Sequence, residues 1–255
     1  MRITYIHHSG FLVETDSCYY LFDYETGQLP KMDVVKPIFV CSSHAHEDHY
    51  NPEVLDVVAE AGMKKVYAIL SDDIEVRMLE DGDAAKADDK DDAEGDDGGI
   101  NVSETVADDF DVNVMQVSAG HEYDLGYGQK LTTFKSTDEG VAFLIEEGGK
   151  LIYHAGDLND WIWEGESYAY NKQMTKDYRK EIELLAEKLA GRKIDVAFVV
   201  LDPRQQHYCD RGMCYFLENV GVEKVYPMHY WDKPTVIDDF VKEHPEYTNQ
   251  IQRTE

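Results

Sequence analysis

The string H-A-H-E-D-H at residues 44–49 gathers the most chemically active side chains of the sequence. Neutral imidazole nitrogens and a carboxylate are the ligands that zinc prefers, and they also suit manganese and iron. The two-residue spacing of His44 and His46 lets both rings point the same way from an extended segment. Asp48 and His49 can then turn toward a second point close by. The string therefore predicts a site for divalent metal ions.

The segments that must position this string read as alternating strands and helices. Runs of β-branched and aromatic residues predict strands at 3–6, 11–14, 19–22, 37–41, 65–70, 112–117, 130–135, 141–146, 151–154, 194–201 and 225–228. Helices are predicted from an Asn51 cap to Gly62, over 174–190 with Thr175 as cap, near 214–219 and over 236–241. Strand, loop, helix and strand in succession indicate a layered α/β fold.

The charge of the chain restricts its partners. Its 255 residues contain 24 Lys and Arg against 52 Asp and Glu, a formal net charge of −28. Nucleic acids and anionic membrane surfaces would be repelled. The sequence contains no run of 18 or more apolar residues that could span a membrane. Its first residues lack the pattern of a signal peptide. We expect one cytoplasmic domain over 1–255 that acts on a small molecule, with its oligomeric state undetermined.

An acidic segment interrupts the pattern of strands. Residues 81–97 hold nine acidic residues, two lysines and no large apolar side chain. Such a segment buries too little apolar surface to offset its ordering entropy. We expect a mobile surface insertion at about 81–99. A calcium site is the alternative, but the spacing of an EF-hand loop is absent.

The cysteines show no close paired spacing of the C-x-x-C kind. Cys209 and Cys214 lie near His207, which raises the alternative of a metal site. Free cysteines are more commonly small buried apolar residues, however, and disulfides are rare in cytosolic chains. We therefore expect no metal role for them.

The H-x-H-x-D-H string resembles the mark of the metallo-β-lactamase fold hydrolases. The stretches HHSGFLVETDSCYYLFDY, IYHAGDLND and VYPMHYWD are similar to further motifs of that family. The resemblance implies an αββα sandwich of two mixed sheets flanked by helices. It also implies two divalent ions, with zinc expected and manganese or iron as alternatives. His44 and His46 would hold one ion, Asp48, His49 and His229 the second, and Asp157 would be shared.

One family ligand is missing from this sequence. The family usually supplies a further histidine about twenty residues before the bridging aspartate, and no histidine stands in TTFKSTDEGVAF. Asp138 is the best replacement because a carboxylate can take the place of an imidazole on zinc or manganese. A turn residue beside Gly140 is the alternative for Asp138. His121 is a weaker substitute.

Several other residues lie near the predicted strand ends. His8 and His154 are candidates for side chains that orient the metal ligands. The alternative is that they are interior histidines with satisfied hydrogen bonds. Arg204 is a candidate anion clamp for a substrate phosphate or carboxylate. The aromatic residues that follow IYHAGD form either a wall over the metals or a packing cluster: Trp161, Trp163, Tyr168 and Tyr170.

Together these motifs predict a metal-dependent hydrolase. A metal-activated water would attack an ester, phosphodiester, lactone or amide, with Asp48 orienting the water as well as binding metal. The missing signal peptide favours the lactonase and phosphodiesterase-like branch of the family. A di-iron redox protein of the same fold is an alternative, although such proteins usually place a glutamate where this chain has His46. A metal-binding protein without catalysis is a further alternative.

Overall fold

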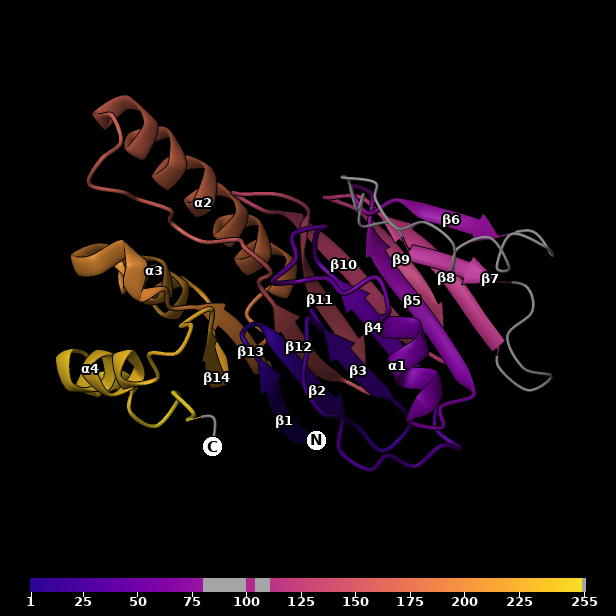
Figure 1. The fold of residues 1–255 in the computed structure, drawn as a ribbon. Coiled ribbons are helices and arrows are strands. Elements are labelled where there is room, and N and C mark those ends of the chain that lie inside the picture. Colours follow the sequence, from indigo (N-terminus) through magenta and orange to yellow (C-terminus); the bar gives the residue numbers. More distant parts are fainter. Residues whose placement is uncertain (80–99, 104–110, 254–255) are drawn as a thin grey trace. The chain divides into compact units, whose positions relative to one another are not determined.

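The computed structural model describes residues 1–79, 100–103 and 111–253 (Figure 1). Contacts within the chain divide it into two compact units, Met1–Gln116 and Val117–Glu255, and each is described by itself. The acidic insertion predicted at 81–99 lies outside the described residues. The prediction of one domain over 1–255 stays a prediction.

The first unit is built on a six-stranded mixed sheet with the order β1-β2-β3-β4-β5-β8. Its strands are β1 (Arg2–His7), β2 (Gly10–Glu14), β3 (Tyr19–Phe22), β4 (Ile38–Ser42), β5 (Lys65–Ser71) and β8 (Asp111–Val117). β1, β2 and β3 pair antiparallel, whereas β3, β4 and β5 pair parallel. A short helix, α1 (Val54–Glu60), buries Val54, Leu55 and Val58 in the core of this unit. β6 (Val76–Leu79) and β7 (Ile100–Ser103) form a separate parallel pair.

Strands β3 and β4 explain why the H-A-H-E-D-H string lies where it does. Every residue of both strands is buried, as expected for continuous apolar runs in the middle of a sheet. Phe22 lies beside Cys41 in their parallel register, so both strands end at one edge. The next residues, Asp23 and Ser43, therefore emerge together, and the backbone N–H of Asp23 donates to the Cys41 carbonyl at 2.9 Å.

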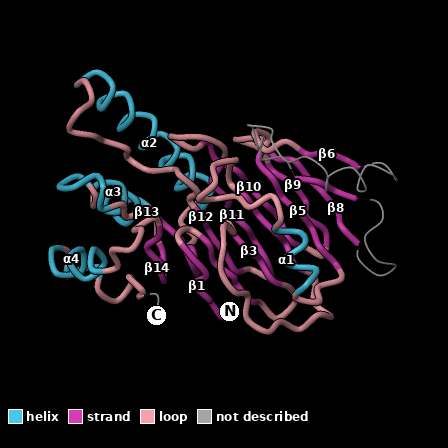
Figure 2. Tube along the Cα trace, viewed as in Figure 1, coloured by secondary structure: helices cyan, strands magenta, loops and turns pink. Residues whose placement is uncertain are grey.

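The second unit contains another six-stranded mixed sheet, with the order β14-β13-β12-β11-β10-β9 (Figure 2). Its strands are β9 (Glu122–Gly126), β10 (Gln129–Lys135), β11 (Val141–Glu147), β12 (Lys150–His154), β13 (Ile194–Val200) and β14 (Val222–Met228). β9 to β12 pair antiparallel, and β12, β13 and β14 pair parallel. The helices are α2 (Tyr168–Leu189), α3 (Arg211–Asn219) and α4 (Thr235–Glu243), with 3-10 turns η2 (Pro203–Tyr208) and η3 (Pro245–Tyr247).

The three parallel strands of this sheet each lead directly to a polar residue. β12 is followed closely by Asp157, β13 by Asp202 and β14 by His229. The carboxyl ends of neighbouring parallel strands meet at the same edge, where α/β sheets place their ligands. This edge therefore gathers side chains that are far apart in the sequence.

The helix starts differ from the sequence-based expectation. α2 begins at Tyr168 with Ser167 as its cap, and Ser167 Oγ accepts the Tyr170 N–H at 3.2 Å. Thr175 lies inside that helix and donates to Asp160 Oδ1 at 2.7 Å. Asn51 does not cap α1 directly, because its side chain accepts the Glu53 N–H in a turn before the helix. The predicted strands are confirmed, whereas β6, β7 and β9 were not predicted.

Candidate functional site

In the first unit, the loop after β4 brings the string of histidines into a compact cluster. Single ligand atoms of His44, His46 and Asp48 lie within 4.8 Å of one another, and those of His44 and His49 meet the same limit. His44 and His49 are fully buried, and their ring centroids are 4.2 Å apart. The loop turns at His46, whose carbonyl accepts the His49 N–H at 2.9 Å and the Tyr50 N–H at 3.0 Å. These side chains therefore lie close together within this unit, and their roles as ligands stay predictions.

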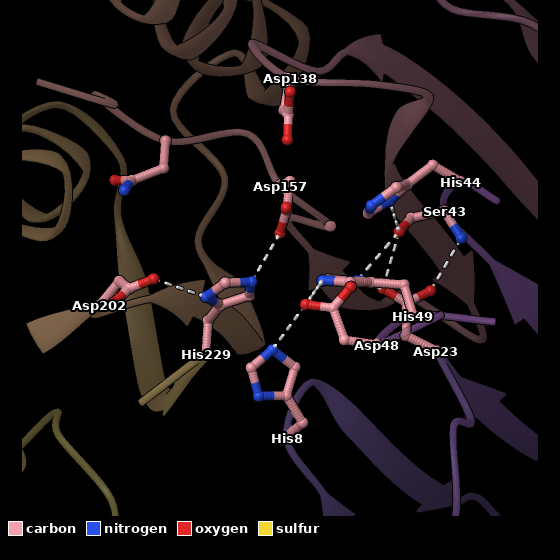
Figure 3. A network of polar contacts seen from close by, with 12 residues as sticks. His8, Asp23, Ser43, His44, Asp48, His49, Asp138, Asp157, Asp202 and His229 are labelled. Atoms are coloured by element: carbon pink, nitrogen blue, oxygen red, sulfur yellow. Dashed lines mark hydrogen bonds and ion pairs between the residues drawn. The ribbon is translucent and has the colours of Figure 1, made fainter. Parts of the chain in front are cut away.

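Asp23 fixes the proton position on His49. The buried carboxylate lies 2.7 Å from His49 Nδ1 (Figure 3), and an ionised carboxylate can only accept hydrogen bonds. His49 Nδ1 must then carry the proton. In the neutral ring, this leaves Nε2 with the lone pair that a metal requires.

The same carboxylate fixes the proton position on His44 through Ser43. Ser43 Oγ donates its one proton to Asp23 Oδ2 at 2.7 Å, so it accepts from His44 Nδ1 at 3.0 Å. The Ser43 backbone N–H also donates to Asp23, at 2.8 Å. His44 Nε2 is thus the atom that carries a lone pair. Asp23 and Ser43 orient two predicted ligands, and sequence reasoning assigned neither a role.

His8 reaches the cluster from the turn between β1 and β2. Its buried ring lies with Nε2 3.3 Å from Asp48 Oδ2, and the same carboxylate oxygen is 4.0 Å from His49 Nε2. His8 and Asp23 both have a positive φ, 48° and 40°, which non-glycine residues seldom adopt. Such backbone strain is concentrated at functional sites. The contact with Asp48 is what an orienting role for His8 requires, and that role stays a prediction.

The donor set of this cluster fits a divalent metal. It combines two buried imidazoles with a defined lone pair, an exposed third imidazole and a half-buried carboxylate. These are the nitrogen and oxygen donors of zinc, iron and manganese sites. The ligand roles of the individual residues stay predictions.

In the second unit, Asp157 lies in a turn that follows β12. The buried His154 ring holds this turn, because its Nδ1 accepts the Gly156 N–H at 3.1 Å. The Trp161 indole N–H donates to the Asp157 carbonyl at 2.8 Å. This contact fits either reading of His154, an orienting residue or a satisfied interior histidine, and its role stays a prediction.

Asp138 lies beside Asp157 within the second unit. One carboxylate oxygen of each residue falls within 4.8 Å of the other. The Thr137 hydroxyl ties the two loops, since it donates to the Asn159 carbonyl at 2.6 Å and accepts the Asn159 N–H at 2.9 Å. The proximity supports Asp138 over His121, which is exposed with Nδ1 2.9 Å from the Ala119 carbonyl. Among the described residues, no candidate metal group contains His121.

His229 is held by Asp202 at the end of β13. His229 Nδ1 lies 2.9 Å from Asp202 Oδ2, and its Nε2 lies 3.4 Å from Asp157 Oδ1. Burial alone would raise the pKa of Asp202, but hydrogen bonds from His229 and Arg204 outweigh it and lower the pKa to about 2. The φ of His229 is 62°, again in the left-handed region. Sequence reasoning missed Asp202, whose only signal is a carboxylate directly after an apolar strand.

Arg204 is engaged with Asp202. Its Nε and Nη2 atoms donate to Asp202 Oδ2 at 2.8 and 2.6 Å, and the guanidinium lies 4.4 Å from the Trp231 ring centroid. An anion clamp would have to share this guanidinium with Asp202. The role of Arg204 in substrate binding stays a prediction.

The aromatic residues after IYHAGD divide into two groups. Trp161 is buried, and its ring centroid lies 5.5 Å from that of His229. Trp163 stacks on Trp161, with 5.9 Å between the two ring centroids. Tyr168 and Tyr170 begin α2 and are 80% and 42% exposed. Trp161 therefore lies beside the predicted ligand His229, and Trp163 packs on Trp161.

Comparison with known proteins identifies the family. Residues 2–167 match the sequence model of the beta-lactamase superfamily domain. The chain belongs to the beta-lactamase superfamily. No curated protein sequence matches this superfamily member. None of its described helices is long and apolar enough to cross a membrane.

Solved structures agree with the assignment to the superfamily. Igni18, a metallo hydrolase from the archaeon Ignicoccus hospitalis, has a TM-score of 0.55 and 19% identity, over 99% of this chain and 94% of its own. A possible metal-dependent hydrolase from Veillonella parvula has a TM-score of 0.50 and 10% identity, over 99% and 96%. The diiron β-hydroxylase CmlA from Streptomyces venezuelae has a TM-score of 0.54 and 12% identity, over 99% and 52%. The predicted fold class, the αββα fold of the metallo-β-lactamase family, is confirmed.

Proposed function

We propose that the protein is a hydrolase that uses divalent metal ions, expected to be zinc, to cleave an ester, phosphodiester, lactone or amide. The observation that carries this proposal is the arrangement of His44 and His49 around Asp23. Two imidazoles with the proton placed on Nδ1 keep Nε2 for a metal. A chance group of loop histidines would not be expected to share one buried carboxylate.

When bound, the ions would polarise the substrate carbonyl or phosphoryl group and activate water. Asp23 and Ser43 hold the two buried imidazoles in one orientation. The carboxylate of Asp48 can hold metal and accept a hydrogen bond from the attacking water. Following the family pattern, we propose a two-ion centre whose other ligands are His46, Asp138, Asp157 and His229.

The substrate is proposed to be a small molecule that is neutral or cationic. The formal net charge of −28 disfavours nucleic acids and anionic membranes as partners. The guanidinium of Arg204 could reverse that preference locally, but an anionic substrate would have to share it with Asp202. A cytoplasmic location and the lactonase or phosphodiesterase-like branch remain proposals from the sequence.

A di-iron redox protein is the second candidate function. It is retained because a diiron β-hydroxylase is among the solved structures of similar fold. This chain covers 52% of that protein, and at 12% identity the likeness concerns the fold alone. Imidazole is also a suitable ligand for zinc as well as for iron, so the three histidines of the string do not select iron.

The test combines metal analysis with a substrate panel. Purified protein is assayed for zinc, manganese and iron, and for hydrolysis of chromogenic phosphodiester, lactone, ester and lactam substrates. We expect at least one metal per chain and an activity that His44→Ala removes. His207→Ala is the matched control, because that exposed ring pairs with the exposed Glu164 at 3.4 Å and is not a predicted ligand. Less than about half a metal per chain, with no effect of His44→Ala, would refute the proposal, and an iron-rich, oxygen-consuming preparation would favour the second candidate.

A further inference from the structure

A second group of residues of metal-ligand type lies in the second unit, at the start of α3 and the end of α4. It consists of Asp210, Cys214 and His244, and one ligand atom of each lies within 4.8 Å of the other two. Asp210 directly precedes α3, Cys214 is in its first turn, and His244 directly follows α4. The i, i+4 spacing of Asp210 and Cys214 places both on one side of a helical turn. His244 is thirty residues further along the chain.

The distances converge on one atom, His244 Nε2. It lies 2.9 Å from Asp210 Oδ2 and 3.5 Å from Cys214 Sγ. Zinc bonds of about 2.3 Å to sulfur and about 2.0 Å to nitrogen put these two donors about 3.5 Å apart in a tetrahedral site. The sulfur–nitrogen separation already has this value. The oxygen–nitrogen separation would have to open by only a few tenths of an ångström as a metal replaces the shared proton.

We propose that Asp210, Cys214 and His244 bind one zinc ion, at a site separate from the predicted hydrolytic centre. Mixed sulfur, nitrogen and oxygen donors suit this borderline-soft ion. The three side chains line a hollow of about 330 Å³, which leaves space for a water molecule as the fourth ligand. Binding breaks the Cys214 S–H bond and releases its proton to solvent, while the proton on the neutral His244 ring moves to Nδ1.

The surroundings of the three side chains are arranged for such a site. Asp210 occupies the cap position of α3, yet within the described residues its carboxylate makes no capping hydrogen bond and turns to His244 instead. His244 Nδ1 lies 3.9 Å from Glu246 Oε1, so a carboxylate faces the nitrogen opposite the metal-binding atom. The His244 ring packs against the buried Phe240, with 4.8 Å between the two ring centroids. The imidazole therefore packs against Phe240, while a carboxylate lies near its Nδ1.

A catalytic Cys–His–Asp arrangement does not fit the same residues. In such a triad the thiol and the carboxylate contact opposite ring nitrogens. Here Asp210 contacts Nε2, which is also the ring nitrogen nearer to Cys214 Sγ. Burial, together with nearby acidic groups, raises the pKa of the Cys214 thiol to about 12, so the uncomplexed thiol is a poor nucleophile. A bound cation would instead stabilise the thiolate.

Cobalt substitution tests the proposal without any assay of activity. The full-length protein is stripped of metal and titrated with Co²⁺, and the sulfur-to-cobalt charge-transfer band is recorded in the near ultraviolet. The predicted hydrolytic centre contains no sulfur ligand, so the band reports the Cys214 site alone. We expect the band in the wild type and in Cys209→Ser, a matched control in the same segment. We expect Cys214→Ser to lack the band and to hold one zinc ion fewer by mass spectrometry.

Two further variants separate ligation from loss of the thiol. Asp210→Asn and His244→Gln keep Cys214 but remove another proposed ligand, and both should weaken zinc binding at least tenfold in a competition titration. Circular dichroism checks that each variant is folded. A wild type without the cobalt–thiolate band, or a Cys214→Ser variant that keeps both band and zinc, would overturn the proposal. Neither result depends on whether the protein is a hydrolase.

Discussion

Asp23 and His49 are joined by a 2.7 Å hydrogen bond in which both side chains are fully buried, although 26 positions separate them in the sequence. The bond links the end of β3 to the end of the histidine string. Its direction defines which nitrogen of His49 can bind a cation. Ser43 extends the same control to His44.

Replacing Asp23 should therefore weaken metal binding. In Asp23→Asn the side chain loses its charge and can present an N–H toward His49, so the imidazole is no longer held in one tautomer. Loss of such an outer partner typically lowers metal affinity about 10- to 100-fold. A competition titration with a chromogenic chelator measures it. Ser43→Ala removes the partner of His44 but keeps the hydrogen bond between Asp23 and His49, so it should have a smaller effect. An unchanged affinity in both variants would contradict the assignment.

Gly10 should not tolerate a side chain. A Cβ at this position would lie 2.8 Å from the His7 carbonyl oxygen and 3.0 Å from that of Asp23. Both are backbone atoms, so Gly10→Ala should lower the free energy of unfolding by about 1–3 kcal/mol. Urea denaturation measures it. Gly165→Ala is the control, since nothing lies within 4 Å of its added Cβ, and it should be close to neutral.

The ion pair between Glu146 and Arg192 should give a stability difference that depends on pH. Two contacts of 3.0 Å join the side chains, and the hydrogen bond from Arg192 lowers the pKa of Glu146. Because the pKa of Glu146 is lower in the folded than in the unfolded chain, the ionised carboxylate stabilises the fold at pH values above the unfolded-state pKa. This stabilisation is lost as the pH falls through the folded-state pKa. Because both groups are partly exposed, Glu146→Gln should lower the free energy of unfolding by less than about 1 kcal/mol at neutral pH. Denaturation at pH 7 and pH 3 should show the difference vanish in acid, and an equal difference at both pH values would refute it.

Removing metal should lower the melting temperature. A ligand that binds only the folded chain, at a free concentration about 100 times its Kd, adds about 2.7 kcal/mol per site. Chelator should reduce the melting temperature of the wild type, and readdition of zinc should restore it. His44→Ala and Cys214→Ser should each remove part of the zinc-dependent rise, and the two losses should add if the sites are independent. A melting temperature that is indifferent to chelator would count against both sites.

The sequence predicted those parts of the fold and site whose signals are local. The H-A-H-E-D-H string and the apolar runs of β3 and β4 are visible without any structure. Ser167 was missed as a cap because the residues after it, such as Tyr168 and Tyr170, face solvent and add no apolar periodicity. β9 was missed because it is a short, mostly exposed strand at the edge of its sheet.

Contacts between distant segments could not be predicted. Asp202 reaches His229 because β13 and β14 are parallel neighbours, which the sequence does not state. Cys214 was expected to be an inert apolar residue, since the nearby histidine in sequence is His207. His244, which α4 carries to it, gives a metal role a physical basis. The ligand roles of Asp138, Asp157 and His229 stay predictions until metals are located.

The dependence of His44 and His49 on Asp23 has a consequence for peptide models of this chain. A synthetic octapeptide of residues 43–50 would contain every donor of the string but not the carboxylate that sorts its tautomers. Its imidazoles would exchange protons freely, and each would present either nitrogen to a cation. In the intact chain that selection is completed before any ion arrives. Short mimics should therefore bind divalent ions with less discrimination among metals than the folded protein does.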